Sequence, residues 1–86
     1  MPEISRFYGI VIQIYFADHP PPHFHAIYAG EVATVGIDSL TIIAGTLPRR
    51  AFGLVVDWAS AHQQELRDAF ARAAALEPPG TIAPLE

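Results

Sequence analysis

The chain has 86 residues, of which 51% are hydrophobic and 16% are charged, and its formal net charge is −4. This length has room for one core, so residues 1–86 are expected to form a single domain. The absence of cysteine excludes disulfide bonds and thiolate metal sites. The negative net charge disfavours nucleic acid as a partner, although the five basic residues, all arginines, could still form a local patch.

Hydropathy sets two further expectations. The sequence has no leader-length apolar run after a basic segment and no stretch of the roughly 20 apolar residues that span a bilayer. We therefore expect a cytoplasmic protein that does not enter a membrane. The charged fraction is low for so small a chain, which predicts an exposed apolar patch and hence a homodimer.

The first half of the chain has the alternating pattern of strands. Residues 7–16 are predicted to form one strand, which the proline run Pro20-Pro21-Pro22 ends. Further strands are expected at about 23–29, 31–37 and 40–44, separated by short turns. Connections this short favour antiparallel pairing. The expected fold is therefore α+β, with a small antiparallel sheet of three to four strands.

The second half changes to the spacing of three and four residues that is typical of an amphipathic helix. One long helix is predicted at about 48–76, with Trp58 on its apolar stripe, followed by a tail at 77–86. A helix of this length would extend beyond so small a sheet. Its overhanging half is expected to pack against a second subunit.

Two segments resemble a known family. They are the opening ISRFYGIVIQIYFADHPPPHFH and the segment LPRRAFGLVVDWASAHQQEL. Together they resemble the small bacterial and archaeal proteins of domain-of-unknown-function family 4160 (DUF4160), and the resemblance extends over residues 4–85. It implies a short protein often encoded beside another small protein, as in a toxin–antitoxin or regulatory pair. It implies no activity.

The most chemically distinctive segment is the histidine-rich loop. His23 and His25 are two residues apart on a predicted strand, so both imidazoles point to the same face. With Asp18 and His19 they could bind a divalent metal such as zinc. Alternatively, His23 and His25 could act without metal as acid and base, or the histidines could be structural. We expect no cofactor, with the metal as the alternative.

Arg49 and Arg50 form a second candidate site at the predicted helix start. The helix N-terminus favours anions, and two guanidinium groups strengthen that preference, whereas a plain surface pair is the alternative. We consider one shallow anion site that also includes His19, His23 and His25. A strict up-and-down strand order would instead place the arginines and the prolines at opposite ends of the sheet.

These observations support two functions. The first is a binding or regulatory component of a toxin–antitoxin-like pair, with a small partner encoded nearby. The alternative is a small nuclease or phosphoryl-transfer enzyme, with or without a metal, in which His23 and His25 move protons and Arg49 and Arg50 hold phosphate. Whether the protein is an enzyme stays open at this point.

Overall fold

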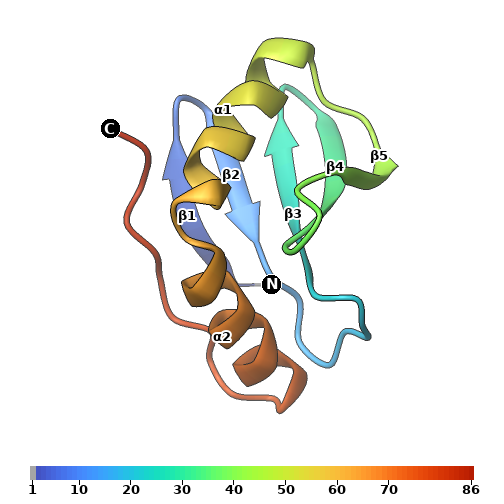
Figure 1. Cartoon of the computed structure of the whole chain (residues 1–86), viewed down its shortest axis with the longest axis vertical. Coiled ribbons are helices and arrows are strands. Elements are labelled where there is room, and N and C mark those ends of the chain that lie inside the picture. The colour runs from blue at the N-terminus through green and yellow to red at the C-terminus, as the bar shows by residue number, and fades with distance from the viewer. Residues whose placement is uncertain (1) are drawn as a thin grey trace.

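The computed structural model describes residues 2–86 and has the α+β class that the sequence predicts. Its five strands form one antiparallel sheet in the order β1-β2-β3-β4-β5, and two helices follow (Figure 1). Neither helix is long and apolar enough to cross a membrane. The elements are β1 (Glu3–Phe7), β2 (Ile10–Gln13), β3 (His23–Tyr28), β4 (Glu31–Gly36), β5 (Ile42–Gly45), α1 (Arg49–Ser60) and α2 (Gln63–Ala74).

The prediction of one strand at 7–16 is wrong, because the chain reverses direction within these residues. Tyr8 and Gly9 have φ angles of 50° and 79°, and this left-handed pair joins β1 to β2 as a hairpin. Phe7 pairs directly with Ile10, so both side chains lie on the same face of the sheet. The sheet therefore has five strands, whereas three to four were predicted.

The single long helix predicted at 48–76 is also wrong. The chain leaves helical geometry at His62, where φ is −130° and ψ is 23°, so α1 ends at Ser60 and α2 begins at Gln63. The Gln63 side chain donates a hydrogen bond to the Ile37 carbonyl at 2.9 Å, which ties this break to the sheet. Phe70 of α2 is buried in the core, with its ring centroid 5.3 Å from that of His23, so it is not available to a second subunit.

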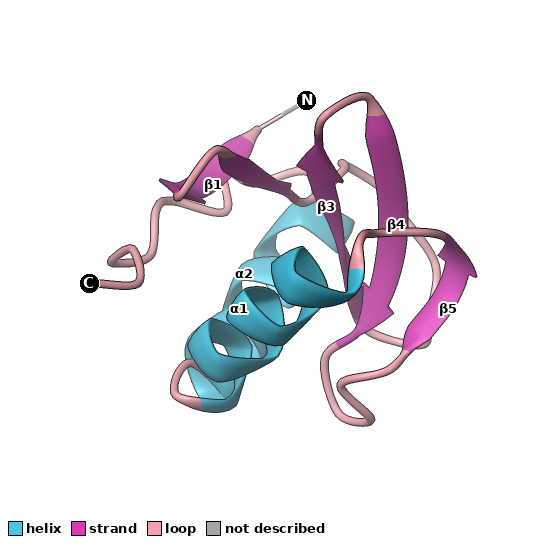
Figure 2. Cartoon of the chain, turned by 90° about the horizontal axis from the view of Figure 1, so that it is seen from above, coloured by secondary structure: helices cyan, strands magenta, loops and turns pink. Residues whose placement is uncertain are grey.

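Both helices lie on one side of the curved sheet (Figure 2). The core forms between the helices and the sheet, and it contains the isoleucines of β2, Phe24 of β3 and Val35 of β4. Trp58 of α1 lies at its centre: its ring centroid is 5.2 Å from that of Phe7 and 5.9 Å from that of Phe24. The α1 stripe is thus buried as its spacing predicts.

The opposite face of the sheet, which we call the open sheet face, carries two cross-strand rows. One row is Val11–Ile27–Val32 and the other is Gln13–His25–Thr34. Their side chains alternate with core residues such as Ala26 and Ala33, so they point away from the helices. Val32 is 45% exposed. His25, at the end of the histidine-rich loop, is therefore on this face.

The C-terminal tail runs beside β1. The Ile82 backbone N–H donates to the Ile4 carbonyl at 2.7 Å, and Trp58 Nε1 donates to the Ala83 carbonyl at 2.8 Å. The tail thus joins the outer strand to the centre of the core.

Replacing Trp58 by Ala should reduce the free energy of unfolding by about 3–5 kcal/mol, because the change leaves a cavity between Phe7 and Phe24. Urea denaturation measures the loss. Leu76→Ala is the control, since Leu76 is 70% exposed and its truncation should cost less than about 0.5 kcal/mol. Equal losses in the two variants would contradict the packing described here.

Candidate metal centre

The segment between β2 and β3 is fixed at both ends by backbone hydrogen bonds. The Ala17 N–H donates to the Ala73 carbonyl of α2 at 3.0 Å, and the Ile37 N–H donates to the Pro22 carbonyl at 3.0 Å. Pro20, Pro21 and Pro22 restrict the backbone between these anchors. The segment therefore presents Asp18 to the start of β3 in one defined position.

Asp18 uses its two carboxylate oxygens for two different contacts. Its Oδ1 accepts the His19 backbone N–H at 3.0 Å, and its Oδ2 lies 2.7 Å from His23 Nε2. The other ring nitrogen of His23, Nδ1, lies 2.7 Å from the Pro21 carbonyl and must donate to it, because a carbonyl oxygen only accepts. His23 Nε2 therefore faces the Asp18 carboxylate at hydrogen-bond distance, and it is the ring nitrogen of His23 that could coordinate a metal ion.

His25 lies beside this pair on the same face of β3. Its Nε2 is 3.7 Å from Asp18 Oδ2, and its Nδ1 is 3.3 Å from the Thr34 hydroxyl across the sheet. The Tyr15 ring stacks on the imidazole at a centroid distance of 3.9 Å, which helps to leave only 12% of the His25 side chain exposed. Nε2 is buried and has no hydrogen-bond partner among residues 2–86. Buried polar atoms without a partner are rare in folded proteins.

These side chains bring three ligand atoms together. One atom each from Asp18, His23 and His25 all lie within 4.8 Å of one another. Ligand atoms on a tetrahedral zinc ion are about 3.3 Å apart, given metal–ligand bonds of about 2.0–2.1 Å. The distances of 2.7 Å and 3.7 Å from the carboxylate to the two imidazoles lie on either side of this value. Small side-chain movements would therefore suffice to bind an ion.

The surroundings add a second polar atom without a partner. Gln13 pairs directly with His25 across β2 and β3, and its Oε1 is also buried without a hydrogen bond among the described residues. Among residues 2–86, three buried side-chain atoms have no hydrogen-bond partner, and two of them are thus on neighbouring residues of the open sheet face. Thr34 can accept the Nδ1 proton of His25, which would direct the Nε2 lone pair towards the site.

The electrostatics favour the forms that bind metal. Burial raises the pKa of Asp18, but hydrogen bonds from His23 and the His19 backbone outweigh it, so the pKa lies below its ordinary value. Burial lowers the pKa of His25, the neighbouring His23 lowers it further, and Asp18 only partly opposes this. Asp18 is therefore a carboxylate and His25 a neutral imidazole, the forms that coordinate an ion.

The structure separates the other predicted site residues from this cluster. The His19 side chain is not among the converging groups, and the contact from His19 to Asp18 comes from its backbone. Arg50 lines a pocket with Tyr28, at the far end of β3 from His23. About 17 Å separates the two ends of a six-residue strand. Arg49 and Arg50 therefore do not share a site with the histidines.

Sequence reasoning missed three neighbours of His25, namely Gln13, Tyr15 and Thr34. Alternation along the predicted strand 7–16 places Tyr15 and Gln13 on one side, but their partners depend on which strands pair and in which register. The available signal was the alternation: once β2, β3 and β4 are aligned by their core residues, Gln13 and Thr34 fall on either side of His25.

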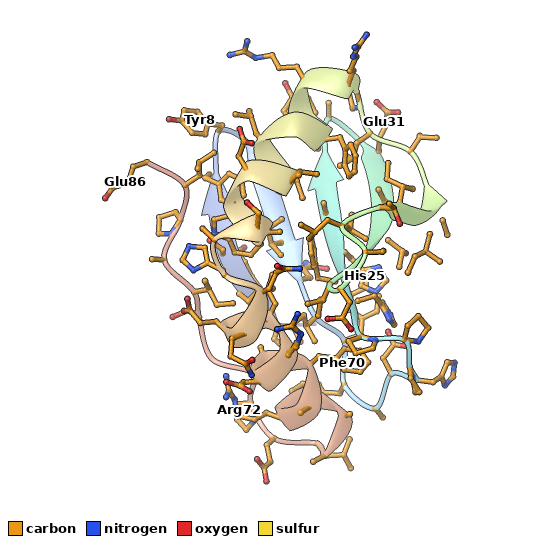
Figure 3. All side chains as sticks on the ribbon, viewed as in Figure 1. Tyr8, His25, Glu31, Phe70, Arg72 and Glu86 are labelled. Atoms are coloured by element: carbon orange, nitrogen blue, oxygen red, sulfur yellow. The ribbon has the colours of Figure 1, made fainter. Side chains whose placement is uncertain are left out.

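Figure 3 shows His25 on β3 with Phe70 of α2 close to the same end of the sheet.

Replacing Asp18 by Ala should destabilise the metal-free protein by about 1.5–3 kcal/mol, because it removes the acceptor for His23 and for the His19 backbone. Chemical denaturation in the presence of a chelator measures this change. Asp38→Ala is the matched control: it removes an exposed ion pair with Arg67 and should cost less than about 1 kcal/mol. A loss no greater than that of the control would show that Asp18 does not hold the loop.

Comparison with known proteins gives one match. A family model described as "Domain of unknown function (DUF4160)" matches residues 9–71, which is more than half of the chain and includes the whole Asp18–His23–His25 cluster. No curated protein and no solved structure gives a significant match.

Proposed function

The chain belongs to the DUF4160 family, and from the geometry of its site we propose that it is a small binding and regulatory module that takes a divalent transition-metal ion at Asp18, His23 and His25. One observation carries the proposal: the buried Nε2 of His25 has no hydrogen-bond partner among residues 2–86, yet it points to the same place as two other ligand atoms. A metal ion would satisfy that nitrogen and would also be coordinated by His23 Nε2 and the Asp18 carboxylate.

The ligand set favours a particular class of metal. Imidazole nitrogens suit zinc and neighbouring transition metals, whereas magnesium and calcium prefer oxygen ligands. Two imidazoles and one carboxylate leave at least one coordination position open for water or for a group from a partner. We propose that Gln13 Oε1, a buried atom without a partner on the residue paired with His25, accepts a hydrogen bond from such a water.

We expect one zinc ion to bind per chain in isothermal titration calorimetry, with no comparable heat from magnesium. His25→Ala should weaken zinc binding by about tenfold or more, which corresponds to at least about 1.4 kcal/mol, because it removes one of three ligands. Zinc should also raise the melting temperature of the parent protein, since the ion binds only the folded state strongly.

His19→Ala is the matched control for this titration. It removes a neighbouring histidine whose side chain is outside the cluster, so zinc affinity should be unchanged. If His19→Ala loses as much affinity as His25→Ala, or if His25→Ala binds as tightly as the parent, the assigned ligands are wrong.

The open sheet face supports the binding role. Val11, Ile27 and Val32 form a continuous apolar row across three strands, and neither helix covers it. We propose that a second copy of the chain covers this row and that the protein works in the cytoplasm as one component of a toxin–antitoxin-like pair. The low charged fraction favours such burial, because a small domain exposes few large apolar patches.

Light scattering at micromolar concentration should give the mass of a dimer, and Val32→Glu should convert it to a monomer that keeps its fold, because the new charge would lie within the apolar row that the second copy covers. Leu76→Glu introduces the same charge at an exposed position after the end of α2, outside this row, and should leave the dimer intact. A monomeric parent, or a dimeric Val32→Glu variant, would rule out this interface.

An enzyme of the nuclease or phosphoryl-transfer class is the second candidate, because a three-ligand metal with an open position can activate water. His23 and His25 are its acid–base candidates when no metal is bound. The position of the arginines counts against it, since Arg50 lies at the opposite end of β3 and cannot hold a phosphate at this cluster. We therefore favour the binding module.

A further inference from the structure

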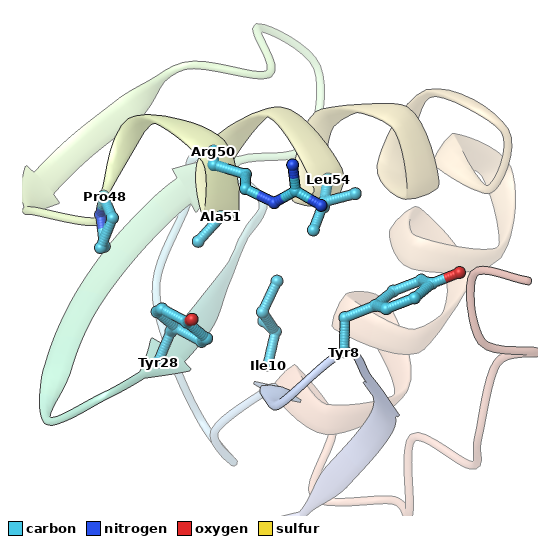
Figure 4. A pocket seen from close by; sticks show the side chains of 7 residues that line it. All are labelled: Tyr8, Ile10, Tyr28, Pro48, Arg50, Ala51 and Leu54. Carbon is cyan, nitrogen blue, oxygen red and sulfur yellow. The ribbon is translucent and has the colours of Figure 1, made fainter.

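A second concave site lies at the other end of β3, between the β1–β2 turn and the first turns of α1. It is a pocket of about 260 Å³ with Tyr8 and Tyr28 on opposite sides, Ile10 between them and Arg50 extending from α1 above (Figure 4). The residues come from the β1–β2 turn, from β2, from β3 and from the start of α1. The fold, and not a local motif, therefore builds this pocket.

Tyr8 is held in an unusual position. Its φ of 50° is left-handed, a conformation that bulky residues rarely adopt, and its side chain is 60% exposed. The residues that favour this turn position are Asn, Asp and Gly, so neither the turn nor the core requires a tyrosine there. Residues kept in such conformations cluster at binding and active sites. The exposed ring on one wall of a pocket is thus a feature that folding alone does not explain.

Arg50 supplies the charge. Arg6, Arg67 and Arg72 each donate a side-chain hydrogen bond to a carboxylate or a carbonyl, whereas Arg49 and Arg50 have no such partner among residues 2–86. Of these two, Arg50 lines the pocket and Arg49 does not. The first turn of α1 contains no acidic residue that could neutralise it. The pocket therefore combines two aromatic walls, an apolar floor and one free guanidinium group.

We propose that this pocket binds a nucleoside monophosphate, with its base against Tyr8 and Tyr28 and its phosphate on Arg50. Aromatic walls stack on a planar base, and a guanidinium group pairs with a phosphate. Its volume of about 260 Å³ is just below the roughly 300–1,000 Å³ that is usual for ligand pockets, so one small ligand fits with part of its surface exposed. The net charge of −4 opposes the backbone of a long nucleic acid, so the occupant is a free nucleotide and not a polymer.

The test is a calorimetric titration of the full chain with adenosine 5′-monophosphate in the presence of a chelator, so that failure of the metal proposal does not affect the result. The parent should bind. Arg50→Gln and Tyr8→Ala should each weaken binding about tenfold, because one loses the phosphate contact and the other a stacking wall. Both residues are exposed, so both variants should fold.

Arg49→Gln is the matched control, since Arg49 is the adjacent cation but does not line the pocket. It should bind adenosine 5′-monophosphate like the parent. The proposal is overturned if the parent does not bind at millimolar nucleotide, or if Arg49→Gln loses as much affinity as Arg50→Gln. It is also overturned if inorganic phosphate alone binds as tightly as the nucleotide, or if a single-stranded oligonucleotide binds more tightly.

Discussion

The alternation of side chains along β3 determines where both candidate sites lie. Phe24 and Ala26 point into the core, so His23 and His25 must point to the open sheet face. Tyr28, at the far end of the strand, returns to the helix side and forms a wall of the pocket. A shift of one residue in register would exchange the two faces, burying the histidines and exposing Phe24. The apolar core thus fixes the position of the polar chemistry.

The β-strand pattern of the sequence predicted the sheet but not its first hairpin. Ile10, Ile12 and Ile14 are buried on one face, as their spacing predicts. Alternation continued straight through Tyr8 and Gly9, as in the single strand predicted at 7–16, would place Phe7 on the opposite face. A two-residue turn places Phe7 directly across from Ile10, so both are buried. The Tyr-Gly pair was the signal for this turn, and the tyrosine made it hard to recognise because Asn or Asp is usual there.

The break between the two helices and the geometry of the site were also not predictable from residue spacing. Trp58, His62 and Leu66 keep a spacing of four across the break, so the sequence pattern gave no sign that α1 ends at Ser60. The proposed ligands Asp18, His23 and His25 were among the predicted residues because they are close in sequence and of the right chemical type. Their distances, the exclusion of His19 and the contribution of Gln13 depend on how the strands pair, which residue type and spacing do not encode.

The tail beside β1 has a consequence for assembly. A five-stranded open sheet has two edges, and each edge is a template on which further strands could add. The bond from Ile82 to Ile4 occupies part of the β1 edge, whereas β5 has no such cover among residues 2–86. Edge-to-edge pairing through β5 alone joins two sheets and stops there, because the β1 edge of each copy is partly occupied. The tail thus opposes edge-to-edge growth of the sheet in a protein with few charged residues.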